Sequence, residues 1–452
     1  MLISRFKEVL ESSVRYLYPN IKISPEIEFD GQYLAKLNDD GSMDVKGDIH
    51  SLSGYRISRD QPFLPTDVEL MVTFIKETDQ IEALPNMSNE YIDALRTTAL
   101  NKAIADALSP DASPVILKVI NALTRLSERT YEGSKIRYGV FINTLLEADN
   151  RTNNISFSNF MQENYSAVLT NGTESFVELD KDGFILRYLQ LNSEKSDLGL
   201  APYDYTRILE YCGNNVIGVV LSSQSEILVF HDNELKYTKR GGRWNPYNHK
   251  ETIRVIHERS ENDNLLFAKA VYITALDLSF GTTGGIISFL DENEIKRALQ
   301  HINIHDIVNS KYYDIKKEML KDDNDPAYES IKDLNFDDFL KLKENGKSCV
   351  LNKVIGRRKF FQLYRKLRQE LVAIDGATVI DYNGDIVAVG AIIKIEAGSK
   401  GGGRIAAART LSNYGIAIEI SSDSSIKGFA LDSNGVPEQI FTIADFNTMR
   451  IE

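Results

Sequence analysis

The stretch DGATVIDYNGDIVAVGAII, residues 375–393, has the pattern of two apolar strands joined by a short turn at YNG. The residues before it, FFQLYRKLRQELV (360–372), have the apolar spacing of a helix. The residues after it, SKGGGRIAAA (399–408), place three adjacent glycines directly before another expected helix, from about 404 to 412. This order of helix, hairpin and helix predicts an α/β fold.

A second hairpin is expected at 418–434, after the helix that follows the glycines. Both hairpins have earlier counterparts in the chain, because residues 174–186 align with 375–387 and residues 219–234 align with 418–434. The first alignment places Glu174 opposite Asp375, and the second matches one Ser-Ser pair with another. The spacing predicts two tandem copies of one α/β unit. The alternative is that any two β-hairpins with serine-rich turns look alike.

We therefore predict, for each of two related units, a mixed central sheet flanked by helices. The expected boundaries are 1–85 for an N-terminal α+β region, 86–250 for the first unit and 251–452 for the second. Charged sequence at about 292–343 is expected to form a helical insertion in the second unit.

Composition limits the classes of function. The chain has 452 residues and a net charge of −13, and an acidic surface opposes general binding to DNA or RNA. No apolar run reaches the roughly 18 residues of a transmembrane helix. The two cysteines, Cys212 and Cys349, cannot form a disulfide framework. These features predict a cytoplasmic protein without a membrane partner.

The glycine run is the first candidate for a binding site. Gly401, Gly402 and Gly403 precede a helix, and the unpaired N–H groups of a first helical turn bind phosphate well. Arg404 adds a planar set of donors, and Lys400 is a further candidate cation. The alternative is a surface loop without a ligand, and the spacing does not fit a P-loop.

The motif Asp375-Gly376-Ala377 is the second candidate. It lies where an expected helix gives way to a strand, and an aspartate at such a junction can hold a divalent cation or orient a ribose hydroxyl. The alternative is an aspartate that caps a turn. A carboxylate that faces a phosphate cradle is the layout of a nucleotide site with a metal ion.

With these motifs, residues from about 255 to 452 resemble the diadenylate cyclase domain of bacterial cyclic di-AMP synthases. That family has an Asp-Gly-Ala motif at the start of a hairpin, matched by 375–377, and a Gly-Thr-Arg-His-Arg-Ala-Ala motif that opens a helix, matched by GGRIAAARTLS (402–412). GGIISFL (284–290) resembles an early strand of the family, and IEISSDSSI (418–426) a later one.

The resemblance implies a nucleotide site with Mg²⁺ or Mn²⁺ at Asp375 and with phosphate held by Gly376, Ala377 and residues 400–404. In the family, two domains meet face to face and join two ATP molecules. This sequence departs from the pattern, because the family's threonine, histidine and second arginine fall at Gly403, Ile405 and Ala406. Losing a donor to the transition state typically costs about 10²–10³ in rate, whereas binding suffers less.

The resemblance therefore favours a sensor of a nucleotide, such as ATP or a cyclic dinucleotide, with the first unit as a degenerate copy. It also implies a role in bacterial defence signalling, and a homodimer or a downstream effector protein as partner. One alternative is an active nucleotidyltransferase that makes a cyclic dinucleotide such as cyclic di-AMP, with Asp375 as a catalytic residue. Another is an interaction scaffold without a ligand.

Overall fold

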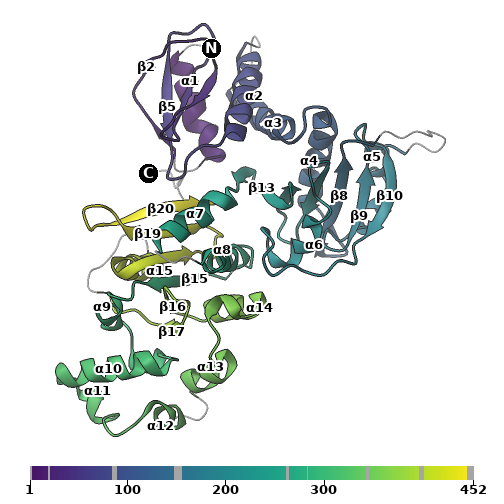
Figure 1. The fold of residues 1–452 in the computed structure, drawn as a ribbon. Helices are drawn as coiled ribbons and strands as arrows, with labels where there is room; N and C mark the ends of the chain where they lie inside the picture. The colour runs from purple at the N-terminus through teal and green to yellow at the C-terminus, as the bar shows by residue number, and fades with distance from the viewer. Residues whose placement is uncertain are drawn as a thin grey trace. The chain divides into compact units, whose positions relative to one another are not determined.

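The computed structural model describes residues 3–18, 21–83, 89–146, 155–260, 264–281, 283–342, 346–395 and 402–444. They form two compact units, Met1–Asn248 and His249–Glu452, each of which we describe by itself (Figure 1). No helix within these ranges is long and apolar enough to cross a membrane.

The first unit begins with a small antiparallel sheet and three long helices. The sheet contains β1 (Lys22–Ile23), β2 (Ile27–Glu28), β3 (Ala35–Leu37), β4 (Met43–Val45) and β5 (Ser53–Ser58), with α1 (Ile3–Ser12) packed beside it. The helices are α2 (Pro65–Glu82), α3 (Asn89–Leu108) and α4 (Ser113–Ser127). Their apolar faces share one continuous core with the larger sheet that follows, because the buried side chains of α4 pack on that sheet.

The larger sheet of the first unit has seven strands in the order β10-β9-β8-β11-β12-β13-β14. Their bounds are β8 (Tyr138–Asn143), β9 (Ser175–Leu179), β10 (Ile185–Gln190), β11 (Val216–Leu221), β12 (Ile227–His231), β13 (Glu234–Arg240) and β14 (Arg243–Pro246). β8 and β9 are parallel, and the other neighbours are antiparallel. A short helix, α6 (Thr206–Leu209), precedes β11. Trp244, the only tryptophan, is fully buried here and donates to Asn101 Oδ1 over 2.8 Å.

The second unit has a six-stranded sheet in the order β17-β16-β15-β18-β19-β20. The bounds are β15 (Gly285–Leu290), β16 (Ala377–Asp381), β17 (Ile386–Ala391), β18 (Gly415–Ile420), β19 (Ile426–Leu431) and β20 (Pro437–Ile443). β15 and β16 are parallel, and all other neighbours are antiparallel. The predicted mixed sheets flanked by helices are therefore confirmed.

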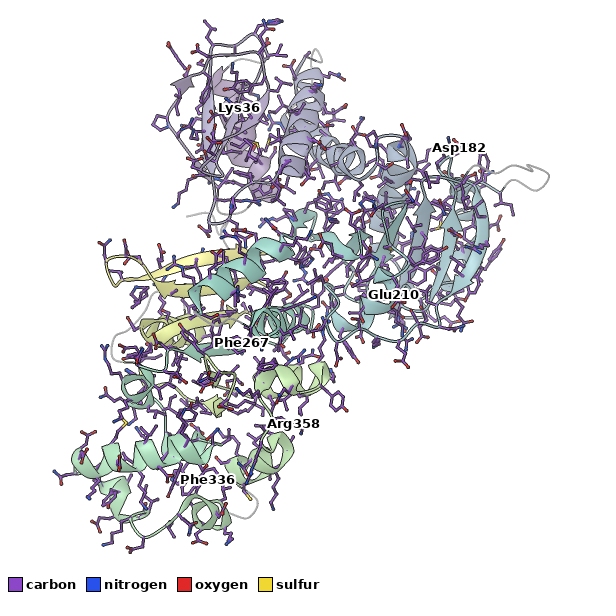
Figure 2. The ribbon with its side chains drawn as sticks, in the orientation of Figure 1. Lys36, Asp182, Glu210, Phe267, Phe336 and Arg358 are labelled. Atoms are coloured by element: carbon purple, nitrogen blue, oxygen red, sulfur yellow. The ribbon has the colours of Figure 1, made fainter. Side chains whose placement is uncertain are left out.

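Helices cover both faces of this second sheet (Figure 1). On one face, α15 (Gly403–Leu411) packs its alanines in a cluster with Ile286, Ala417 and Phe429. On the other face lie α8 (Leu265–Ser279) and α14 (Arg365–Val372), and α7 (His249–Arg259) packs on α8. Phe267 of α8, labelled in Figure 2, packs edge-on against Phe289 of β15 with ring centroids 5.5 Å apart.

The charged insertion is helical but only partly solvated. It contains α9 (Ile295–Leu299), α10 (Ser310–Asp322), α11 (Pro326–Glu329), α12 (Phe336–Lys341) and, beyond the predicted end, α13 (Lys347–Ile355). Tyr312 and Tyr313 of α10 are fully buried, and Phe336 of α12, which is labelled in Figure 2, packs on Tyr313 with ring centroids 5.4 Å apart. The Val308 N–H donates to the Val387 carbonyl over 3.0 Å, so the insertion covers the edge strand β17.

The order β10-β9-β8-β11-β12-β13 in the first unit matches the order β17-β16-β15-β18-β19-β20 in the second. The one parallel pair of each sheet, β8 with β9 and β15 with β16, lies at the same place. The register also matches, because Val140 pairs with Val177 and Ile287 pairs with Thr378. Turns repeat in detail as well: Ser225 and Ser424 both have positive φ, and each donates its N–H to a serine three residues earlier. The predicted repeat thus has a counterpart in topology, register and turn geometry.

Candidate functional site

Asp375 lies between the end of α14 and the start of β16, where it is exposed. Its carboxylate makes no hydrogen bond or ion pair with another residue in the part of the chain that the structure describes. The next residue, Gly376, has φ +109°, and a Cβ at that position would lie 2.7 Å from the Gly390 carbonyl oxygen. Only glycine fits both constraints. The matched pairing of β8 with β9 and of β15 with β16 places Glu174 at the equivalent position of the first unit.

The N-terminus of α15 has no side-chain cap. Gly402 is the N-cap residue, with φ +92°, and its carbonyl accepts the first helical hydrogen bond, from the Ala406 N–H over 3.1 Å. Earlier N–H groups of a helix have no intrahelical acceptor and carry partial positive charge. Gly402, Gly403 and Arg404 are all exposed. The entrance to this helix therefore presents amide donors, together with a guanidinium, to solvent.

The Arg404 side chain turns back onto the beginning of β15. A Cβ added at Gly284 would lie 2.7 Å from the Arg404 Cζ atom and 2.8 Å from the Ile420 carbonyl oxygen. Gly284 precedes Ile286 by two residues, and alternation along the strand directs both positions to the face that α15 covers. A side chain at position 284 would collide with the Ile420 backbone carbonyl, and the Arg404 guanidinium would have to move away.

β15 and β16 bring the acid and the arginine to one end of the sheet. The two strands are parallel neighbours, and Ile286 pairs with Ala377. Gly284 and Asp375 each lie two residues before one of these paired residues, and adjacent strands are about 4.8 Å apart. Asp375 and the glycine on which the Arg404 guanidinium rests therefore both lie just before the paired ends of neighbouring strands.

Not every predicted site residue joins this group. Lys400 and Gly401 lie outside the described residues. The Ala377 side chain is fully buried in the apolar cluster beneath α15, so it can shape the strand but presents no surface to a ligand. The glycines at 376, 402 and 403, together with Asp375 and Arg404, remain accessible or partly accessible at the end of the sheet.

A protein-built metal cage is not present in the described ranges, where no three His, Cys, Asp or Glu residues gather in a metal-binding arrangement. Asp375 alone fits a different mode of binding. Mg²⁺ usually keeps several waters and binds to one or two carboxylates plus the phosphates of a substrate. An exposed carboxylate with no partner among the described residues, at the same end of the sheet as an uncapped helix entrance, is suited to this mode of binding.

The sequence reading missed an ion pair at the equivalent place in the first unit. The Arg207 Nη1 atom lies 2.8 Å from Glu174 Oε1. Arg207 precedes β11 by nine residues, as Ala406 precedes β18. In the first unit, the entrance of α6 and the acid that precedes β9 therefore meet. Extending the alignment of 219–234 with 418–434 towards the N-terminus places Arg207 at the position of Ala406. This difference in charge between the two units could have been found from the sequence.

Comparison of the sequence with protein-family models gives no match, and a search of curated proteins gives none either.

Proposed function

We propose that the second unit is a nucleotide-binding domain related to diadenylate cyclases, and that this chain acts as a cytoplasmic sensor of ATP or of a cyclic dinucleotide. One observation carries the proposal. The uncapped entrance of α15, the Arg404 guanidinium on Gly284 and the Asp375 carboxylate, which has no partner among the described residues, belong to the same end of one sheet.

The chemistry of these groups indicates which part of a nucleotide each of them would bind. The amides at residues 403 and 404 and the guanidinium would hold phosphate oxygens, because charge-assisted hydrogen bonds to oxyanions are short and strong. Asp375 would hold a divalent ion or a ribose hydroxyl. A bound Mg²⁺ or Mn²⁺ would neutralise phosphate charge.

Binding is favoured over catalysis by the residues that follow Arg404. Ile405 packs against the apolar cluster of the second unit, and Ala406 is only 6% exposed. These two positions carry a histidine and an arginine in the cyclase motif that the chain resembles. In this protein they stabilise the helix on its sheet, so they cannot donate to the charge that develops on a phosphate during transfer.

The test is a thermal unfolding experiment with ATP and with cyclic di-AMP, each with and without Mg²⁺. Circular dichroism follows both units, whereas fluorescence of Trp244 reports only on the first unit, in which it is buried. A ligand at 100 times its Kd adds about 2.7 kcal/mol of stability, or roughly 5–10 °C for a unit of this size.

Arg404→Ala is expected to abolish the shift. The control is Arg409→Ala, which removes the same charge from the last turn of α15, where Arg409 stacks over the Phe429 ring. A shift that survives Arg404→Ala would place the site elsewhere, and the lack of a shift with every ligand would refute nucleotide sensing. A cyclic dinucleotide formed from ATP, detected by mass spectrometry and lost in Asp375→Asn, would instead establish the cyclase alternative.

A further inference from the structure

The second unit has an irregularity in its sheet that the first unit lacks. In the first unit, β9 and β10 pair without a break from Glu178 and Arg187 to Ser175 and Gln190. In the second unit, Val379 pairs with Ala388 but Ala377 pairs with Ala391, so β17 contains one extra residue. This bulge lies directly beside the strand end that carries Asp375.

Gly390 is in the bulge and touches the backbone that presents the acid. Its φ is +59°, and a Cβ added to it would lie 3.0 Å from the Asp375 carbonyl oxygen and 2.6 Å from Ile374 Cγ2. Gly376 in turn lies close to Gly390, since a Cβ added to Gly376 would collide with the Gly390 carbonyl group. Two glycines with positive φ thus hold the two backbones in contact.

A lysine from the inserted helices holds the bulge in place. The Lys347 Nζ atom donates to the Gly390 carbonyl oxygen over 2.7 Å and pairs with Asp306 Oδ1 at 2.5 Å. The same ammonium would lie 3.4 Å from a Cβ at Gly390. It is therefore close to the backbone of Asp375.

Lys347 is itself firmly placed, because α13 is tied to the segment that covers β17. Ser348 Oγ donates to the His305 carbonyl, and Asn352 Nδ2 donates to the Val308 carbonyl over 2.8 Å. The Asp306 side chain is only 13% exposed and that of Lys347 is 36% exposed, so the ion pair is partly shielded from solvent.

We propose that Lys347 is a positioning residue of the nucleotide site. By fixing the Gly390 carbonyl it holds the bulge, and through the bulge it sets the direction in which Asp375 faces the ligand and its metal ion. This assignment rests on the proposed function, and it gives the inserted helices a task at the site besides covering the sheet edge.

The experiment measures the Kd for ATP by calorimetry, with Mg²⁺ and with EDTA, in Lys347→Met and in the control Lys353→Met. Lys353 lies on the same helix and is exposed. Residues that orient a metal-binding group typically contribute about tenfold or more to affinity, so Lys347→Met is expected to raise the Kd about tenfold with Mg²⁺ and much less with EDTA. Lys353→Met should bind as the wild type does. Lys347→Arg, which keeps a donor, should recover part of the loss.

A double-mutant cycle with Asp375→Asn separates positioning from general damage. Once the carboxylate is removed, Lys347→Met should have no further effect on the Kd. Gly390→Ala, which disturbs the same contact from β17, is expected to reproduce the Mg²⁺-dependent loss and serves as the second variant.

Two outcomes would overturn the assignment: wild-type affinity in Lys347→Met, or an equal loss with Mg²⁺, with EDTA and in the Asp375→Asn background. If the wild-type protein binds no nucleotide at all, it is the proposed function that fails, together with everything built on it.

Discussion

The large sheets of the first and second units share the same order over six strands, but they differ at the end of the sheet where Glu174 and Asp375 lie. In the first unit, Glu174 is paired with Arg207, and its carbonyl accepts a hydrogen bond from the Leu191 N–H over 2.7 Å. The chain from 191 to 199 continues across α6, with the Ser196 N–H donating to Thr206 Oγ1 over 3.0 Å. In the second unit, the acid has no partner among the described residues, and a buried alanine replaces the arginine. The first unit thus neutralises this acid with an arginine, whereas the described residues of the second unit provide no such partner.

Side chains beneath the helix explain why the entrances differ. In the first unit, Phe141 stacks on Phe176 with centroids 4.2 Å apart and also contacts Tyr211. The matched register places Ser288 and Ala377 at the positions of the two phenylalanines. Small residues let the alanines of α15 approach the sheet, which permits a nine-residue helix where the first unit has only four residues in α6. The two units thus share one strand order, and a few side chains decide how the end of the sheet that carries the acid differs between them.

The largest expected difference between the copies is in their stability. Arg365 of α14 and Asp277 of α8 form a fully buried ion pair, with an Nε–Oδ2 distance of 2.7 Å. The alignment of RLS (125–127) with DLS (277–279) puts the exposed Arg125 at the position of Asp277. Arg365→Met should cost about 3–5 kcal/mol, because it leaves a buried carboxylate without its partner.

Urea unfolding followed by circular dichroism checks this value. Arg125→Met is the matched control and should change stability by no more than about 0.5 kcal/mol. Equal losses in the two variants would mean that the buried pair does not distinguish the second unit.

A smaller effect, dependent on pH, is expected at the turn between β16 and β17. Burial raises the pKa of the Asp381 carboxyl, which accepts a hydrogen bond from Tyr312 over 2.5 Å. The folded state then binds the proton more tightly than the unfolded state, so this group lowers stability as the pH rises from its unfolded value of 3.8 through the raised pKa. Tyr312→Phe should cost about 1–3 kcal/mol at pH 7, because the ionised carboxylate loses its donor.

The loss in Tyr312→Phe should shrink as the pH falls below the raised pKa of Asp381, because the carboxyl then carries its proton. Chemical denaturation at several pH values measures this dependence. Asp381→Asn cannot ionise, and it should remove the pH-dependent part. A loss that is larger at pH 4 than at pH 7 would contradict the assigned sign.

The smallest effect is expected at the ion pair of the first unit. The Glu174 side chain is 53% exposed and that of Arg207 is 27% exposed, so solvent weakens their attraction. A double-mutant cycle with Glu174→Gln and Arg207→Met should give a coupling free energy of no more than about 1 kcal/mol. Removal of the arginine should not create a nucleotide site, since residues 191–199 still lie across α6. A nucleotide-dependent shift in Trp244 fluorescence in Arg207→Met would break the comparison between the copies.

Much of the fold could be predicted from sequence because it depends on local patterns. The hairpins of the second unit were located by alternating apolar residues and by turns such as YNG, and the helix after the glycines begins within a residue of its predicted start. The alignment of Glu174 with Asp375 was recovered because both copies keep the same spacing between strands. The insertion was predicted to be helical, but its burial was not, since Tyr312 and Tyr313 find partners only in the folded unit.

The candidate site could be predicted only in part from the sequence. Asp375 and Arg404 were identified from their own motifs, but the contact of Arg404 with Gly284 joins residues 120 positions apart. The contact of Lys347 with Gly390 crosses from an insertion to an edge strand, and no periodicity marks it.

The sequence by itself predicted the main strands and helices, positions where glycine is required, and a repeated α/β unit to which the matching strand orders correspond. These properties follow from interactions between near neighbours: the rotation of side chains along a strand or helix and the freedom of φ at glycine. Only the tertiary structure decided which acid is neutralised by an arginine, which has no partner among the described residues, and which lysine bonds to the Gly390 carbonyl. Those choices depend on side chains that meet after the sheet has formed, and their energies come from burial and charge across long separations in the chain.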